Sequence, residues 1–124
     1  MSAPRSWHCC LIVEDEPLVA MSLEDWLEEA GYEVCASLGS AGETLAWLEK
    51  NLPHFAVVDV GLKHGPGHEV ARELKRQSVP FLIFSGSPAE SASSPELRDV
   101  PWIEKAHGRA ALLEAISKLA LQPS

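Results

Sequence analysis

The sequence predicts an α/β fold in which a doubly wound, parallel sheet of five strands carries helices on both faces. The chain has 124 residues, which suits one domain with a core of its own. Short apolar runs alternate five times with segments of helical periodicity, the order typical of β-α units. The runs are apolar almost throughout, as strands are when both faces of a parallel sheet are covered.

The first strand and helix are expected within residues 7–31. Trp7–Val13 is nearly all apolar and stops at Glu14, which indicates a buried strand. Pro17 suits the first turn of the following helix, and Gly31 suits its end. The apolar face of this helix would consist of Val19, Leu23, Trp26, Leu27 and Ala30. Its opposite face would be a solvated row of acids, namely Glu24, Asp25, Glu28 and Glu29.

The second strand and helix are expected within residues 32–53. Tyr32–Leu38 reads as a strand. Ser40 followed by Glu43 has the pattern of a capping box, and Pro53 would end the helix. The buried stripe of this helix is predicted to be Leu45, Leu48 and Leu52.

The next strands come before and after a glycine-bearing loop and a short helix. Phe55–Val60 is apolar except for Asp59, and Gly61–Gly67 is the loop. His68–Gln77 forms a short helix with Val70, Ala71 and Leu74 facing inward. Pro80–Ser85 is the fourth strand.

Residues 86–99 interrupt the alternation. They contain two prolines and four serines, so the fourth helix is expected to be short or missing. Val100–Glu104 then forms a short fifth strand, and Arg109–Leu121 forms the final helix. We expect one domain over residues 7–121, preceded by a flexible tail over residues 1–6.

Charge and cysteine content narrow the functional class. The net charge is −8, and residues 1–49 hold ten acids and one base. An acidic chain without a basic cluster is a poor candidate for direct nucleic-acid binding. The longest apolar runs fall far short of the roughly 20 residues of a membrane helix, and no signal peptide is visible. Three cysteines (Cys9, Cys10 and Cys35) have no zinc or redox spacing, so we expect inert buried thiols and a reducing cytoplasm.

Polar residues with related chemistry stand at the ends of four strands. Glu14 and Asp15 follow the first strand, Asp59 ends the third, Ser85 ends the fourth and Lys105 follows the fifth. The carboxyl ends of parallel strands meet at one edge of the sheet, where sites of this fold lie. Clustered carboxylates need a cation, and oxygen ligands suit Mg²⁺. An Asp can be the nucleophile in phosphoryl transfer, with a Lys neutralising charge and a Ser hydroxyl binding the phosphoryl oxygen. The alternative for Glu14 and Asp15 is a helix cap, which explains one acid but not both.

These residues, taken in order, resemble the receiver domains of two-component response regulators. The resemblance rests on Leu11-Ile12-Val13-Glu14-Asp15-Glu16, Val57-Val58-Asp59-Val60, Ile83-Phe84-Ser85-Gly86 and Ile103-Glu104-Lys105. It covers the chain from about Trp7 to Leu121 and implies a flavodoxin-like strand order of 2-1-3-4-5. The segment 86–99 is similar to that of a receiver subgroup with a shortened fourth helix.

The resemblance also implies the role of each residue. Asp59 would be the phosphoacceptor. Mg²⁺ would be held by Glu14, Asp15, Asp59 and the backbone carbonyl of Gly61. Lys105 would contact the phosphoryl group, and Ser85 and Trp102 would be the switch residues.

Two features depart from the family pattern. Ala106 replaces the usual cis proline, which predicts a trans bond because a non-proline cis bond costs roughly 3 kcal/mol. Gly61 also offers no side chain to an attacking water.

The resulting prediction is a stand-alone cytoplasmic receiver domain that takes part in a phosphorelay. A sensor histidine kinase or a histidine phosphotransfer protein would supply the phosphoryl group, and a downstream protein would receive the signal. The domain would catalyse only its own aspartyl phosphorylation and dephosphorylation. One alternative is an unphosphorylated pseudo-receiver that binds other proteins. Another is an aspartate-nucleophile phosphatase, but Gly61 stands where that family needs a second Asp. The sequence leaves the kinase, the target and the oligomeric state open, a homodimer included.

Overall fold

The computed structural model describes residues 9–61, 67–86, 97 and 99–120. The expected tail over residues 1–6, the expected strand start at Trp7, most of the segment 86–99 and the expected helix end at Leu121 lie outside these ranges. The prediction of a short or missing fourth helix therefore falls mainly on residues that are not described. Within the described residues, no helix is both long enough and apolar enough to cross a membrane.

The five predicted strands form one parallel sheet, and the predicted order is confirmed. The strands lie in the order β2-β1-β3-β4-β5, and every neighbouring pair is parallel. Their bounds are β1 Cys9–Val13, β2 Glu33–Leu38, β3 Phe55–Val58, β4 Phe81–Ser85 and β5 Trp102–Glu104. The ends are shorter than predicted by up to two residues, which is usual because strand ends depend on ladder hydrogen bonds rather than on apolar pattern.

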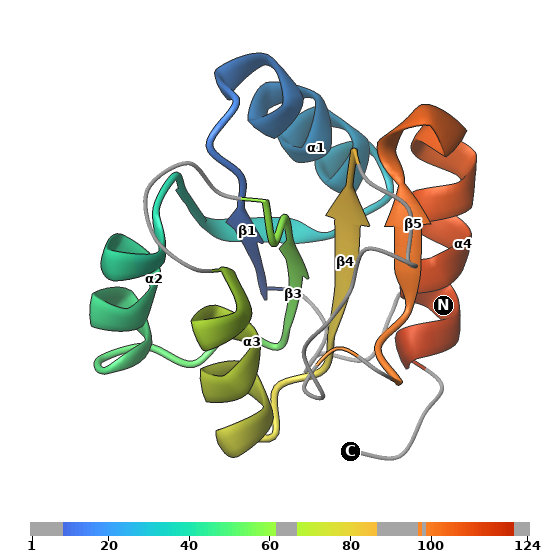
Figure 1. Cartoon of the computed structure of the whole chain (residues 1–124). Coiled ribbons are helices and arrows are strands. Elements are labelled where there is room, and N and C mark those ends of the chain that lie inside the picture. Colours follow the sequence, from blue (N-terminus) through green and yellow to red (C-terminus); the bar gives the residue numbers. More distant parts are fainter. Residues whose placement is uncertain (1–8, 62–66, 87–96, 98, 121–124) are drawn as a thin grey trace.

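Helices cover both faces of the sheet, which confirms the doubly wound architecture (Figure 1). The helices are α1 Pro17–Glu29, α2 Ala41–Leu48, α3 Gly67–Arg76 and α4 Gly108–Ala120. Alternate residues of the strands feed two separate cores, as the period of two in a strand requires. Leu11 and Val13 pack in the core under α2 and α3, whereas Cys10 and Ile12 pack in the core under α1 and α4.

The end and the buried face of α2 differ from the prediction. The capping box is confirmed, because the Glu43 N–H donates to Ser40 Oγ at 3.1 Å. However, α2 stops at Leu48, and its buried residues are Ala41, Thr44 and Leu48. Leu52 is 65% exposed. Beyond the helix, the Trp47 carbonyl accepts both the backbone N–H and the side-chain amide of Asn51, and Leu52, which precedes Pro53, is disfavoured in a helical conformation.

The prediction of three reduced, inert thiols is wrong for two of them. Cys9 and Cys35 form a disulfide across β1 and β2, and only Cys10 is free and buried. The spacing in sequence gave no sign of this pair, because the contact depends on how the two strands are aligned.

At the end of α1, Ala30 is exposed rather than buried, because it follows the last helical residue.

Candidate functional site

Backbone hydrogen bonds fix Glu14 and Asp59 at the carboxyl edge of the sheet. The Asp59 N–H donates to the Val13 carbonyl at 2.9 Å, and the Glu14 N–H donates to the Leu38 carbonyl at 2.9 Å. These bonds extend the ladders of β3 with β1 and of β1 with β2 by one residue each. Ligand atoms of Glu14, Asp15 and Asp59 all lie within 4.8 Å of one another. The three carboxylates that the sequence predicted to cluster therefore do so.

Two of these carboxylates are almost inaccessible to solvent. Glu14 is 4% exposed and Asp59 is 6% exposed, whereas Asp15 is half-buried. Burial raises the pKa of the Glu14 carboxyl, and the negative charge of Asp59 adds to the rise. Hydrogen bonds from Lys105 and from the Glu16 N–H offset only part of it. A cation is needed here, because unpaired buried charges are costly.

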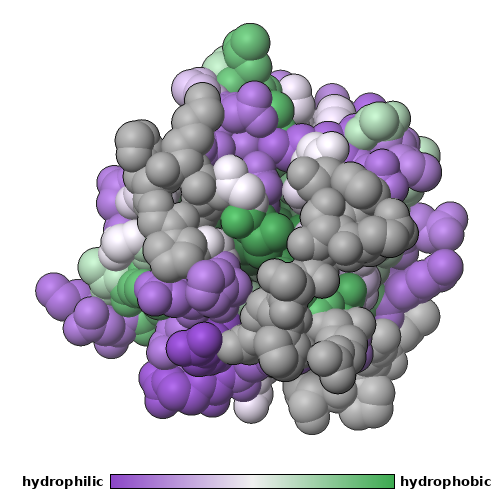
Figure 2. Space-filling model, in the orientation of Figure 1, coloured by the Kyte–Doolittle hydropathy of each residue, from purple (hydrophilic) through white to green (hydrophobic). Residues whose placement is uncertain are grey.

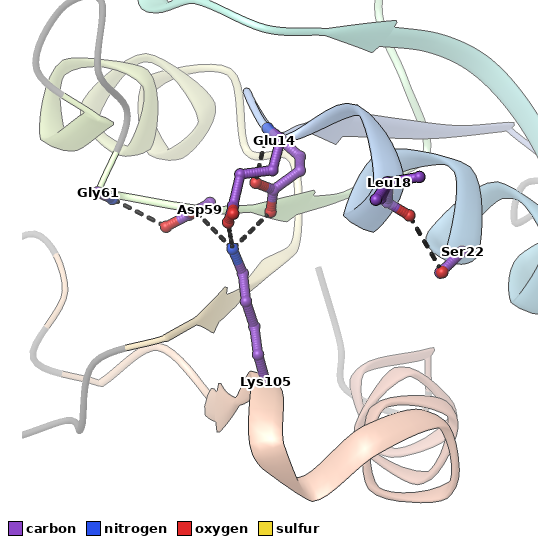
Figure 3. A network of polar contacts seen from close by, with 7 residues as sticks. Glu14, Leu18, Ser22, Asp59, Gly61 and Lys105 are labelled. Carbon is purple, nitrogen blue, oxygen red and sulfur yellow. Dashed lines mark hydrogen bonds and ion pairs between the residues drawn. The ribbon is translucent and has the colours of Figure 1, made fainter.

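Lys105 supplies one such cation (Figure 3). Its Nζ lies 2.9 Å from Asp59 Oδ2, 3.0 Å from Glu14 Oε1 and 3.0 Å from Glu16 Oε1. The side chain is 17% exposed. Burial acts to lower the pKa of Lys105, but the hydrogen bonds to the three carboxylates outweigh it and raise the pKa overall. The ammonium is therefore charged at neutral pH.

The backbone at Lys105 has the trans bond that the sequence predicts. The Lys105–Ala106 peptide bond is trans. Lys105 nevertheless reaches Asp59. It follows β5 directly as the first residue of a short turn over Lys105–His107, which ends at Gly108 with a φ of 76°. Gly108 adopts this left-handed conformation without the penalty that a side chain would bring. A proline after the lysine is therefore not required to place the ammonium in this chain.

Glu16 is a partner of Lys105 that sequence reasoning did not identify. It is the N-cap residue of α1, and its side chain makes no capping hydrogen bond. Its N–H donates instead to Glu14 Oε2 at 3.1 Å. The N-cap residue of α1 is thus Glu16 rather than Glu14 or Asp15, and Glu14 accepts a backbone hydrogen bond just before the helix begins. The one available signal was the unbroken acidic run from Glu14 to Glu16.

Two glycines shape the backbone beyond β3. The Gly61 N–H donates to Asp59 Oδ1 at 2.9 Å, so both oxygens of Asp59 have a donor within the described residues. Gly67, the first residue of α3, lies directly against the backbone of Val60. A Cβ at Gly67 would come within 2.5 Å of Val60 Cα. Sequence reasoning assigned both glycines to a loop but did not foresee the close approach at Gly67.

The two expected switch residues lie on neighbouring strands. Ser85 is the last residue of β4 and is buried. Trp102 begins β5, where it pairs with Ile83. Its half-buried side chain packs against the core under α2 and α3. β4 thus carries Ser85 to the same edge as Asp59, while Trp102 sits one strand further out.

The site combines three clustered carboxylates, an ammonium and a buried hydroxyl at one edge of a five-stranded parallel sheet. The model of the response regulator receiver domain family matches residues 10–117. The chain belongs to this family. Its match extends from β1 into α4, so it includes every residue of the site.

Individual relatives agree with this placement. The transcriptional regulatory protein PdtaR of Mycobacterium tuberculosis is 32% identical over 76 residues, which cover 60% of this chain and 37% of PdtaR. The matched part is thus little more than a third of that relative's length. SdrG from Sphingomonas melonis Fr1 superposes with a TM-score of 0.81 at 29% identity, covering 95% of this chain and all of SdrG. A CheY-like receiver protein from Methanospirillum hungatei JF-1 gives 0.78 at 28% identity, with 92% and 94% covered.

Proposed function

We propose that this receiver domain accepts a phosphoryl group on Asp59 in a reaction that depends on Mg²⁺. The observation that carries the proposal is the setting of the Asp59 carboxylate. One oxygen is held by the Gly61 N–H and the other by Lys105, beside two further acids. This arrangement orients the nucleophile and provides positive charge where a phosphoryl group would arrive.

The donor set fits Mg²⁺, which favours oxygen ligands and keeps several waters. Glu14, Asp15, Asp59 and the Gly61 carbonyl would hold the ion, which supplies positive charge to offset the phosphoryl oxygens. An Asp59 oxygen forms the new P–O bond while the P–N bond of the donor phosphohistidine breaks, and its electron pair stays on the imidazole. Lys105 then pairs with the phosphoryl group, and the Ser85 hydroxyl donates to one of its oxygens.

The output would be a change in the surface around β4 and β5. Ser85 and Trp102 lie on these adjacent strands, so a hydrogen bond gained by Ser85 can shift the packing of Trp102. A downstream protein that reads this surface would receive the signal. We place the reaction in the cytoplasm, where sensor kinases or phosphotransfer proteins supply phosphohistidine.

Phosphorylation of Asp59 is tested with acetyl phosphate and Mg²⁺. Wild type is expected to gain one phosphate by intact-mass spectrometry, and Asp59→Asn is expected to gain none, because the amide is not a nucleophile. Asp25→Asn, which removes an exposed acid on α1, is the matched control and should label normally. Labelling that persists in Asp59→Asn would contradict the assignment, and no labelling of wild type would favour an unphosphorylated pseudo-receiver.

The phosphodonor protein would dock beside α1. Leu18 is 78% exposed and Met21 is 59% exposed, both on this helix. Figure 2 shows hydrophobic residues projecting at the top of the view, over the start of α1. A groove of about 230 Å³ runs from this helix to the site, lined by Leu18, Val19, Ser22, Trp26, Phe84 and Lys105. Exposed apolar side chains next to a reactive group are typical of a protein-binding surface.

If the donor protein docks at α1, changes on this helix should slow labelling by phosphorylated proteins but not labelling by acetyl phosphate. The double variant Leu18→Lys with Met21→Lys should label normally with acetyl phosphate. With a panel of phosphorylated histidine kinases and phosphotransfer proteins, its labelling by the best donor should fall roughly tenfold, because apolar contact area is lost. Leu52→Lys, which changes a leucine after α2 whose exposure lies between those of Leu18 and Met21, is the control. Equal loss in both variants would argue against docking at α1.

A further inference from the structure

The disulfide of Cys9 and Cys35 joins an edge strand to the interior of the sheet. Cys9 begins β1, and Cys35 lies within β2, the strand at the edge. Their Cα atoms are 5.3 Å apart, which is within the range that a disulfide spans without backbone movement. An edge strand has only one neighbour, so a covalent bond to that neighbour restrains it more than it would a central strand.

A bulge in β2 sits at Cys35. Cys10 pairs with Val34, but Leu11 pairs with Ala36, so Cys35 has no counterpart in β1. The bulge also changes which face of the sheet the side chains of β2 occupy. Val34 packs with the core under α1 and α4, whereas Ala36 packs with the core under α2 and α3. The irregularity is therefore centred on the residue that meets Cys9, which is where a bulge re-aims a side chain.

The structure accommodates the reduced pair as well as the bonded one. Cys35 Sγ lies 3.2 Å from the Cys10 carbonyl oxygen, which can accept the thiol hydrogen when the bond is open. Cys9 and Cys35 are both half-buried, so a small reagent can reach them. Cys10 differs in its exposure. It is fully buried in the core under α1 and α4, and burial raises the pKa of its thiol, so little reactive thiolate forms.

We propose that Cys9 and Cys35 are a reversible redox-modification site that reacts with low-molecular-weight disulfides such as glutathione disulfide. One cysteine thiolate attacks the reagent and expels one glutathione. The second attacks the resulting mixed disulfide and expels the other. The two cysteines are oxidised, the reagent is reduced to two thiols, and the two cysteine protons end on these thiols. The proposal is independent of the phosphorylation of Asp59.

Oxidation would also change how often the hydrogen bond between β2 and Glu14 opens. Leu38 ends β2 three residues after Cys35, and its carbonyl accepts the Glu14 N–H. Closing the disulfide holds β2 against β1, so this hydrogen bond opens less often. Amide exchange of Glu14 should slow by roughly tenfold or more on oxidation. The bond closes a loop with a sequence separation of 26, which should raise Tm by roughly 10 °C.

The test equilibrates the full chain with glutathione buffers of graded redox ratio and then counts thiols under denaturing conditions. Three thiols are expected after reduction and one after oxidation, with peptide mapping that links Cys9 to Cys35. Cys10→Ala keeps the pair and should behave as wild type in the Glu14 exchange rate and in the Tm shift. Cys9→Ser and Cys35→Ser should show neither change.

Three results would overturn the proposal. These are three thiols at every redox ratio, a bond that involves Cys10, or stable attachment of glutathione to Cys9 or Cys35 without closure. Unchanged exchange of Glu14 on oxidation would overturn the coupling to the site. Acetyl phosphate labelling of Asp59 is read separately, so failure of the phosphorylation proposal would not be mistaken for failure of this one.

Discussion

Replacing Lys105 with methionine is expected to lower the free energy of unfolding by about 3 kcal/mol near pH 8 in the absence of Mg²⁺. Methionine keeps much of the apolar stem but removes the ammonium that lies within 3.0 Å of Glu14, Glu16 and Asp59. Glu14 and Asp59 are buried, so their charges then repel one another with no cation between them. Urea unfolding followed by tryptophan fluorescence measures the loss.

The loss should depend on pH in a direction set by Glu14. Its folded pKa is raised, so the stability linked to its protonation is present below its ordinary pKa and is lost as the pH rises through the raised value. Without Lys105 the pKa of Glu14 should rise further. The difference between variant and wild type should therefore be large near pH 8 and clearly smaller near about pH 5. Lys105 itself stays charged at both pH values, because both lie well below its ordinary pKa and its pKa in the folded chain is higher still, so the pH dependence comes from Glu14.

Mg²⁺ and a neighbouring variant provide the controls for Lys105. A divalent cation among the same carboxylates should restore most of the lost stability of Lys105→Met. Glu16→Gln should cost less than about 1 kcal/mol, because Glu16 is half exposed and its charge is screened. Equal destabilisation at both pH values, with no rescue by Mg²⁺, would mean that Lys105 contributes through packing rather than through charge.

The predictable part of the site follows from topology. Parallel strands bring their carboxyl ends to one edge, so Glu14, Asp15, Asp59 and Lys105 could be grouped from their positions at strand ends alone. Each is fixed by a short local pattern, an apolar run followed by a polar residue. The family resemblance added roles to residues that this pattern had already brought together.

The features that were missed depend on contacts between distant segments. Glu16 meets Lys105 across 89 residues of sequence, and no local pattern encodes that contact. The Cys9–Cys35 pair depends on a one-residue shift in the alignment of β1 with β2, and such a shift is set by packing on both faces. Leu52 was assigned to a buried stripe because it fits a helical period, yet the helix ends before reaching it.

Gly67→Ala is expected to destabilise the fold by about 3 kcal/mol, the upper end of the usual range for overpacking. The added methyl would lie 2.5 Å from Val60 Cα and 2.7 Å from its carbonyl oxygen. Backbone atoms cannot rotate away as a flexible side chain can, so α3 or the chain after Asp59 has to move. Since Val60 directly follows Asp59, the same shift should slow labelling by acetyl phosphate.

Gly42→Ala separates this steric effect from the general effect of replacing a glycine. Gly42 lies within α2, and a Cβ there would have nothing within 4 Å. Alanine should stabilise the helix by roughly 0.5–1 kcal/mol, because it loses less backbone entropy on folding. The two variants add the same methyl group, so opposite signs in urea unfolding would isolate the contact with Val60. A Gly67→Ala protein as stable as wild type would mean that α3 can move away from β3 at little cost, which would contradict the prediction.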